Sequence, residues 1–240
     1  MTDGSSDRGS VLRVRGLTKT YVSPDGERVP VLDIRTFDVA EREQVALRGS
    51  SGSGKTTLLN IIAGILKPDA GTVHVADEEM TALSEPRRDR LRARTLGYVF
   101  QTFNLLQGYT ALENVALGMM FGGRADTARA ADLLARVGLK DRLQHRPKQL
   151  SVGQQQRVAV ARALVNHPRL VLADEPTGNL DRRHGEDALA LIREVCRDER
   201  AALLLVSHDP AVLAAFERVE DLAAINSVAA DALAAGSEPA

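Results

Sequence analysis

The sequence has a single cysteine, no long run of one charge sign and no long apolar run. Cys196 has no second cysteine to pair with, which excludes an intramolecular disulfide and fits a reducing compartment. The formal net charge of -1 gives no reason to expect a nucleic-acid partner or an acidic substrate. The best apolar runs, AALLLV and VALGMMF, are far shorter than the roughly 18 residues of a membrane span. The amino terminus, MTDGSSDRGS, lacks the basic-then-apolar order of a secretion signal, so we expect a soluble chain.

Length and hydrophobic content indicate one large domain with a subdomain. The chain has 240 residues, of which 44% are hydrophobic. Two β-type segments, 11–22 and 29–39, flank the turn-rich SPDGER and predict an antiparallel β subdomain. Farther along, strands alternate with helices, which favours an α/β core with a mainly parallel sheet. Residues 111–139 show helical spacing without β signals, so we expect an α-helical subdomain at about 101–162.

The same patterns assign the individual elements and the limits of the domain. We place the domain at 11–228, between a disordered tail at 1–10 and a flexible tail at 229–240. Predicted strands are 11–22, 29–39, 44–50, 71–80, 96–101, 169–174, 201–207 and one near Val219. Predicted helices lie within 51–66, 86–94, 111–120, 124–139, 185–199 and 210–216, with another starting at Ser151.

A phosphate-binding loop is the clearest motif. GSSGSGKT, Gly49–Thr56, fits the Walker A pattern G-x-x-x-x-G-K-[ST] and lies between a predicted strand and a predicted helix. Its glycines allow backbone N–H groups to turn toward phosphate oxygens, and the helix amino terminus adds positive partial charge. In this motif Lys55 reaches the β- and γ-phosphates and Thr56 places its hydroxyl on Mg²⁺. The alternative interpretation is a flexible Gly/Ser turn.

Two acidic residues follow a strand that reads as buried. Residues 170–173 are apolar on both faces, as in a central strand, and Asp174 and Glu175 come next. Successive side chains of a strand point in different directions, so the two carboxylates receive separate roles. We assign Asp174 to the Mg²⁺ shell and Glu175 to polarising the attacking water. A pair of solvated carboxylates at a strand end is the alternative.

Two further polar residues end predicted strands. His208 follows LLLVS, where a histidine can sense or hold a γ-phosphate. Gln101 ends LGYVF, and a single amide can reach both a metal-bound water and a mobile loop. For each of them a purely structural role is the alternative interpretation.

The segment LSVGQQQ, 150–156, contains no metal ligand and no general base, yet it is too polar for plain core. Ser151 and Gln154 form the S-x-x-Q pattern of a capping box, so a helix starting here presents its amino terminus to an anion. The Ser151 hydroxyl and the Gly153 N–H are then candidate ligands of a γ-phosphate. The neutral glutamines suit a packed interface because they bury no unpaired charge. The alternative is a capped amphipathic helix of the core.

LSVGQ, Gln101, ADE and His208, together with GSSGSGKT, resemble the nucleotide-binding subunits of ABC transporters. The resemblance covers roughly Val11 to Ile225, and YVFQTFNLL, LTKTY and ADEPTGNLD are most similar to the lipoprotein-release and macrolide-export subgroup. It implies a P-loop NTPase core and ATPase activity with ATP and Mg²⁺ as ligands. The implied catalytic residues are Glu175, His208 and Gln101, and the implied metal ligands are Thr56, Gln101 and Asp174. The implied nucleotide-binding residues are Tyr21, Gly49, Ser50, Ser51, Gly52, Ser53, Gly54, Lys55, Thr56, Thr57, Ser151, Gly153, Gln154 and Asp181.

The resemblance also implies partners and a location. Two copies are expected to pack head to tail, so that LSVGQ of one closes over the ATP of the other, with Asp181 crossing between them and Tyr21 stacking on adenine. A separately encoded membrane permease is the second partner and docks on the helical insertion, at 103–106. The chain would then lie peripherally on the cytoplasmic face of the membrane. Val152, where the family usually has Gly, and the SPDGERV insertion after Tyr21 are departures from the pattern.

The resemblance leaves two alternatives of another class. In a mechanical or regulatory ATPase of the cell-division type, the same motifs drive a membrane partner that transports nothing. A permease with a large external domain and no pore would favour that function. A DNA-repair or chromosome ATPase is disfavoured, because such proteins carry long coiled coils or zinc modules and this sequence shows neither.

Overall fold

The computed structural model describes residues 9–120 and 126–228. The tails expected at 1–10 and 229–240 fall outside this part of the chain, except that β1 already begins at Ser10. The division into a domain and two tails stays a prediction.

The centre of the fold is a parallel sheet with the strand order β6-β7-β8-β3-β9. β7 and β8 are buried along their whole length, which explains why each is an uninterrupted apolar run up to its last residue, Asp174 or Ser207. Because the pairings are parallel, the carboxyl ends of β7, β8 and β3 lie next to one another at one end of the sheet. The strands are β3 (Gln44–Arg48), β6 (Leu96–Val99), β7 (Leu170–Asp174), β8 (Ala202–Ser207) and β9 (Arg218–Asp221).

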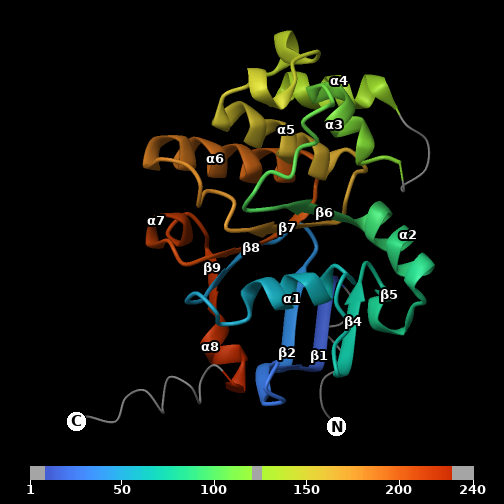
Figure 1. The fold of residues 1–240 in the computed structure, drawn as a ribbon, viewed down its shortest axis with the longest axis vertical. Coiled ribbons are helices and arrows are strands. Elements are labelled where there is room, and N and C mark those ends of the chain that lie inside the picture. Colours follow the sequence, from blue (N-terminus) through green and yellow to red (C-terminus); the bar gives the residue numbers. More distant parts are fainter. Residues whose placement is uncertain (1–8, 121–125, 229–240) are drawn as a thin grey trace.

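Helices cover both faces of this sheet (Figure 1). α1 (Lys55–Ile62) lies on one face, and α5 (Val152–Leu164) and α6 (Arg182–Asp198) lie on the other. The alternation along β8 divides its side chains between two hydrophobic clusters: Leu203 and Leu205 pack with the α5 and α6 side, whereas Leu204 packs with the α1 side. The sheet therefore joins two cores.

An antiparallel sheet with the order β2-β1-β4-β5 packs beyond α1 (Figure 1). β1 pairs with β2 over nearly its whole length, from the Ser10–Ala40 pair to the Val22–Arg28 pair, and the SPDGER turn closes the hairpin. This places Tyr21 at the turn end of the hairpin. The strands are β1 (Ser10–Val22), β2 (Arg28–Ala40), β4 (Ala70–Val75) and β5 (Glu78–Glu79), and α2 (Glu85–Thr95) leads into β6.

The described residues between β6 and β7 form α3 (Ala111–Leu117), α4 (Thr127–Arg136), α5 and short 3-10 turns, with no strand. Side chains cap each helix start: Thr110 and Glu113 form a capping box on α3, Asp126 caps α4, and Ser151 caps α5. These helices stack above α6 in Figure 1.

The predicted fold class is confirmed, with some element limits corrected. The predicted strand 71–80 is two strands, because Ala76 and Asp77 adopt positive φ values of 50° and 70° and turn the chain. α6 starts at Arg182 rather than 185, since the Asp181 carboxylate caps it by accepting from the His184 N–H at 3.1 Å. α7 (Pro210–Leu213) is shorter than predicted, and α8 (Leu222–Ile225) was not predicted.

A membrane-spanning helix is not found in the structure. Across 9–120 and 126–228, every helix is too short or too polar to cross a bilayer.

Cys196 provides a test of the packed core behind α6. Its side chain is fully buried, and burial, together with the negative charge of Glu199, raises the pKa of its thiol to about 12. At pH 8 the folded chain then holds on the order of one thiolate in 10⁴ molecules, and only the thiolate is nucleophilic. We expect no maleimide labelling of the native chain and one label per chain in guanidinium chloride, counted by mass spectrometry. Rapid native labelling would contradict this packing.

Candidate active site

The loop between β3 and α1 is built to leave backbone N–H groups free. Gly52 and Gly54 have φ values of 78° and 97°, in the left-handed region that glycine enters without steric cost. Gly54 is the N-cap of α1 and supplies no side-chain capping bond, so the first N–H groups of the helix are left for an external acceptor. The Ser53 hydroxyl is also buried without a hydrogen-bond partner in the described structure. These donors fit a phosphate chain.

Lys55 is held against this loop. Its side chain is 8% exposed, and Nζ donates to the carbonyl oxygens of Gly49 at 2.7 Å and Ser50 at 2.8 Å. The same Nζ lies 3.6 Å from Oε1 of Glu175. A buried ammonium at the mouth of the loop complements the negative charge of a polyphosphate.

Asp174 ends β7 next to the loop. Its Oδ2 accepts a hydrogen bond from the Thr56 hydroxyl at 2.9 Å. Burial raises the pKa of Asp174 above its usual value, since it outweighs the opposing Thr56 hydrogen bond, and the nearby Glu175 charge raises it further. The hydroxyl and the carboxylate are both hard oxygen donors, and Mg²⁺ typically takes one or two such protein ligands plus substrate phosphates. This donor set fits Mg²⁺.

Glu175 contacts different partners from Asp174. Its φ of 43° is unusual for a residue with a side chain, and it turns the chain out of β7. Oε1 lies 2.7 Å from Nδ1 of His208, and Oε2 accepts from the Ser207 hydroxyl at 3.0 Å. The carboxylate is thus buried and fixed from two sides.

Ser207 is a site residue that our sequence reasoning did not identify. Its side chain is fully buried at the end of β8, where it donates to Glu175 and accepts from the Asp209 N–H at 3.1 Å. The signal in the sequence was weak: one hydroxyl directly before His208 at the end of an apolar strand.

These groups share one cleft of about 400 Å³, within the range of small-molecule sites. Tyr21, Gln101 and His208 reach it from three different elements and line it together with the loop. Tyr21 is 42% exposed, and the Lys19 ammonium lies 5.7 Å from its ring centroid. Gln101 lies close to Gly178, and its carbonyl oxygen accepts from Asn179 at 2.8 Å.

Three predicted residues of the phosphate loop, Gly49, Ser50 and Ser53, line a second hollow beside this cleft rather than the cleft itself. Four other predicted residues line neither: Ser151, Gly153, Gln154 and Asp181. Ser151 and Gln154 form the expected capping box, with the Gln154 N–H donating to the Ser151 hydroxyl at 3.2 Å. Asp181 caps α6, and its Oδ2 lies 2.5 Å from Nδ1 of His184, which lowers the pKa of Asp181. Within one chain these residues are therefore separate from the phosphate loop.

Val152 fits its position without strain. It is the first residue of α5, half exposed, and does not adopt a positive φ. The replacement of the usual glycine therefore leaves the helix start intact and adds an exposed apolar side chain beside Ser151.

Comparisons with known proteins point to one family. A family model described as ABC transporter matches residues 32–178. The chain is 47% identical to a lipoprotein-releasing system ATP-binding protein, LolD 1, of Caulobacter vibrioides, over 85% of this chain and 89% of that protein. It is 45% identical to LolD of Pseudomonas syringae pv. tomato, over 88% of this chain and 93% of that protein. A dimeric ATP-binding cassette in a post-hydrolysis state, bound to ADP and Pi, matches with a TM-score of 0.79 and 37% identity, over 88% of this chain and 93% of that one.

Glu175→Gln tests the carboxylate held by His208 and Ser207. A positioned general base contributes about 10² to 10⁴ in rate, so we expect ATP turnover to fall by that factor. The amide has nearly the same shape, so ATP affinity should stay at the wild-type level in a fluorescent-nucleotide titration. Glu186→Gln, an exposed carboxylate on α6, is the matched control and should hydrolyse ATP normally. Turnover of Glu175→Gln near that of the control would remove Glu175 from this role.

Proposed function

Because the chain belongs to the ABC transporter family, as an ATP-binding and ATP-hydrolysing subunit, we propose that two copies drive a lipoprotein-releasing type of membrane complex. Binding of two ATP molecules closes the pair, and hydrolysis opens it again. The lipoprotein cargo class follows from the names of the relatives. The cell-division type of mechanical ATPase shares the site and differs only in the membrane partner.

The proposal rests on one observation: the candidate phosphate-binding groups of a single chain lie in two separate places. Lys55, Thr56, Asp174, Glu175 and His208 line one cleft, whereas the Ser151 helix start faces elsewhere. A helix amino terminus with a capping serine attracts an anion, so its natural ligand is a phosphate held by another chain. In a head-to-tail pair, the cleft of each chain meets the Ser151 helix start of the other, so the pair contains two complete sites.

We assign a role to each of the main residues in the cleft, and their contacts support the assignment. The phosphate loop and Lys55 bind the β- and γ-phosphates, and Tyr21 stacks on the base. Thr56, Asp174 and Gln101 hold Mg²⁺, which neutralises charge on the phosphates when bound. Glu175 orients the attacking water and accepts its proton, while His208 keeps the carboxylate aligned with the γ-phosphate.

The membrane partner docks on the helical insertion, but on fewer residues than the sequence indicated. Leu105 is only 8% exposed and belongs to the core, and Phe103 packs against that core. Leu106 and Tyr109 are 48% and 44% exposed. A groove of about 490 Å³ between α2, β6, α3 and α5 also opens on the surface. Since ATP is a cytoplasmic substrate, the docked chain lies on the cytoplasmic face of the membrane.

Mixed dimers test whether Ser151 serves the ATP of the other copy. Chains with Lys55→Ala and chains with Ser151→Arg should each be inactive alone. A mixed dimer has one site with both substitutions and one intact site. The intact site combines Lys55 of the Ser151→Arg chain with Ser151 of the Lys55→Ala chain. In chains that also carry Glu175→Gln, we expect the mixture to regain ATP-dependent pairing of separately tagged chains. In chains that keep Glu175, we expect the mixture to regain ATPase activity. No recovery in either assay would contradict the head-to-tail arrangement.

Leu106→Asp tests the docking surface. The side chain is half exposed, so a charge there should leave folding and ATP affinity unchanged while it weakens binding of the membrane partner. Co-purification of the tagged chain with its permease from detergent measures this. Ile65→Asp, an equally exposed apolar site after α1, is the control and should co-purify normally. Equal recovery of both variants would move the docking site elsewhere.

A further inference from the structure

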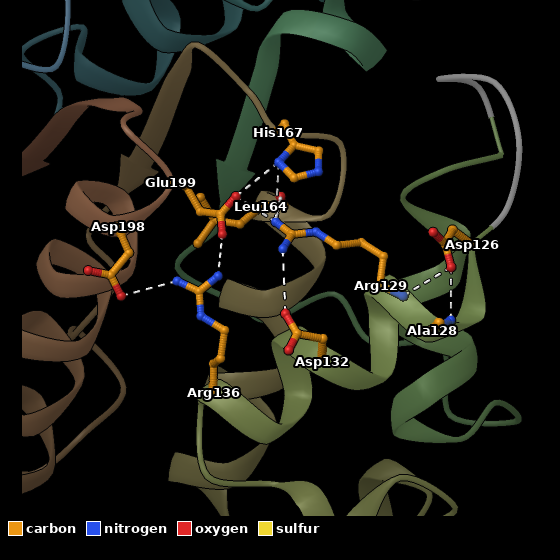
Figure 2. A network of polar contacts seen from close by, with 9 residues as sticks. All are labelled: Asp126, Ala128, Arg129, Asp132, Arg136, Leu164, His167, Asp198 and Glu199. Carbon is orange, nitrogen blue, oxygen red and sulfur yellow. Dashed lines mark hydrogen bonds and ion pairs between the residues drawn. The ribbon is translucent and has the colours of Figure 1, made fainter.

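A buried carboxylate joins the helical insertion to the core on the side of α6 (Figure 2). Glu199 follows α6, and its Oε2 accepts from Nη2 of Arg129 at 2.5 Å and lies 3.0 Å from Nδ1 of His167. Its Oε1 accepts from Nη1 of Arg136. Arg129 and Arg136 belong to α4, and His167 lies in the turn between α5 and β7. We call Glu199 with these three partners the Glu199 clamp.

Glu199 is the buried member of the clamp. Its side chain is 6% exposed, whereas those of Arg129, Arg136 and His167 are 15%, 29% and 67% exposed. Burial alone would raise the pKa of Glu199, but the guanidinium groups of Arg136 and Arg129 outweigh it and hold the pKa below its usual value. A carboxylate of this kind holds its geometry firmly, because loss of one partner leaves a buried charge unpaired. Asp198 adds a rim contact to Nη2 of Arg136 at 3.1 Å.

The clamp lies at the carboxyl ends of α5 and α6. These helices begin at Ser151 and Asp181, which are predicted to face the second copy. α5 runs from its cap at Ser151 to Leu164, whose carbonyl oxygen is 3.5 Å from Nη2 of Arg129. α6 runs from its cap at Asp181 to Asp198, directly before Glu199. Positive charge at the carboxyl end of a helix is favourable, so the two arginines suit this position.

We propose that Glu199 is a positioning residue that sets the angle between α6 and the helical insertion for ATP-dependent closure. α6 has 17 residues and is about 25 Å long, so a tilt of about 5° at the clamp moves its far end by about 2 Å. Hydrogen bonds to a γ-phosphate tolerate only a few tenths of an ångström. A loosened clamp therefore misplaces Ser151 and Asp181 while the phosphate loop, on the opposite face of the sheet, keeps its geometry.

This inference rests on the proposed head-to-tail dimer, and its test separates the two. Glu199→Gln keeps the shape and removes the charge. In a Glu175→Gln background we expect the ATP-dependent dimer to weaken by at least about tenfold, which corresponds to about 1.4 kcal/mol, measured by analytical ultracentrifugation. The affinity of the monomer for a fluorescent ATP analogue should not change, because the monomer uses only its own cleft.

Two further variants distinguish positioning from general stability. Glu43→Gln removes a partly buried carboxylate that pairs with Arg218 of β9, away from the helical insertion, so it should leave dimer formation unchanged. Arg136→Gln should weaken the dimer like Glu199→Gln, and the double variant should be no weaker than Glu199→Gln alone. All variants are compared well below their unfolding midpoints, with folding checked by circular dichroism.

The outcomes are distinct. Weaker dimers with unchanged monomer affinity support the clamp. Equal dimer strength in Glu199→Gln and its parent, an equal loss in Glu43→Gln, or a parallel loss of monomer affinity would each overturn it. If the chain with Glu175→Gln alone does not dimerise with ATP, the proposed dimer is contradicted, and so is the role of the clamp.

Discussion

The parallel pairing of β8 with both β3 and β7 is the constraint on which the site depends. It brings three carboxyl ends to one end of the sheet, and each delivers a different group: the phosphate loop after β3, Asp174 and Glu175 after β7, and Ser207 and His208 after β8. The Thr56–Asp174 and Ser207–Glu175 hydrogen bonds connect these strands across the cleft. A shift of one residue in either pairing would send the strand side chains to the wrong core and separate these groups.

The two hydrophobic cores have different tasks. The α1 core joins the phosphate loop to the antiparallel sheet that carries Tyr21, so the loop and the proposed base contact belong to one body. The other core packs α3, α4 and α5 of the helical insertion against α6, and Ser151, Leu106 and the Glu199 clamp lie on this side of the sheet. Nucleotide binding and the response to a partner are thus built on opposite faces of a shared sheet. In the proposed function, the strand ends and Gln101 would connect the two, since Gln101 lines the cleft and lies close to Gly178.

Local signals made much of this predictable. The Walker A spacing, the apolar runs of β7 and β8 and the capping box at Ser151 each depend on neighbours in sequence, and the sequence therefore predicted them. Contacts between distant residues left no such signal. Ser207 beside Glu175, Arg129 beside Glu199 and the burial of Leu105 all depend on tertiary packing. Leu105 illustrates the limit: in FNLL, one leucine is buried and the next is half exposed, and only the path of the loop decides which.

Glu175 has a left-handed backbone that lowers the stability of the fold, and its side chain is the proposed group that activates water for ATP hydrolysis. A φ of 43° costs a side-chain-bearing residue on the order of 1 kcal/mol, a cost that glycine does not carry. Glycine at this position would relieve that cost, but it would also leave the Ser207 hydroxyl without its acceptor and remove the carboxylate itself. Selection for heat resistance alone gives no reason to keep the carboxylate. Thermostabilised versions of this chain must be screened for hydrolysis as well as for melting temperature.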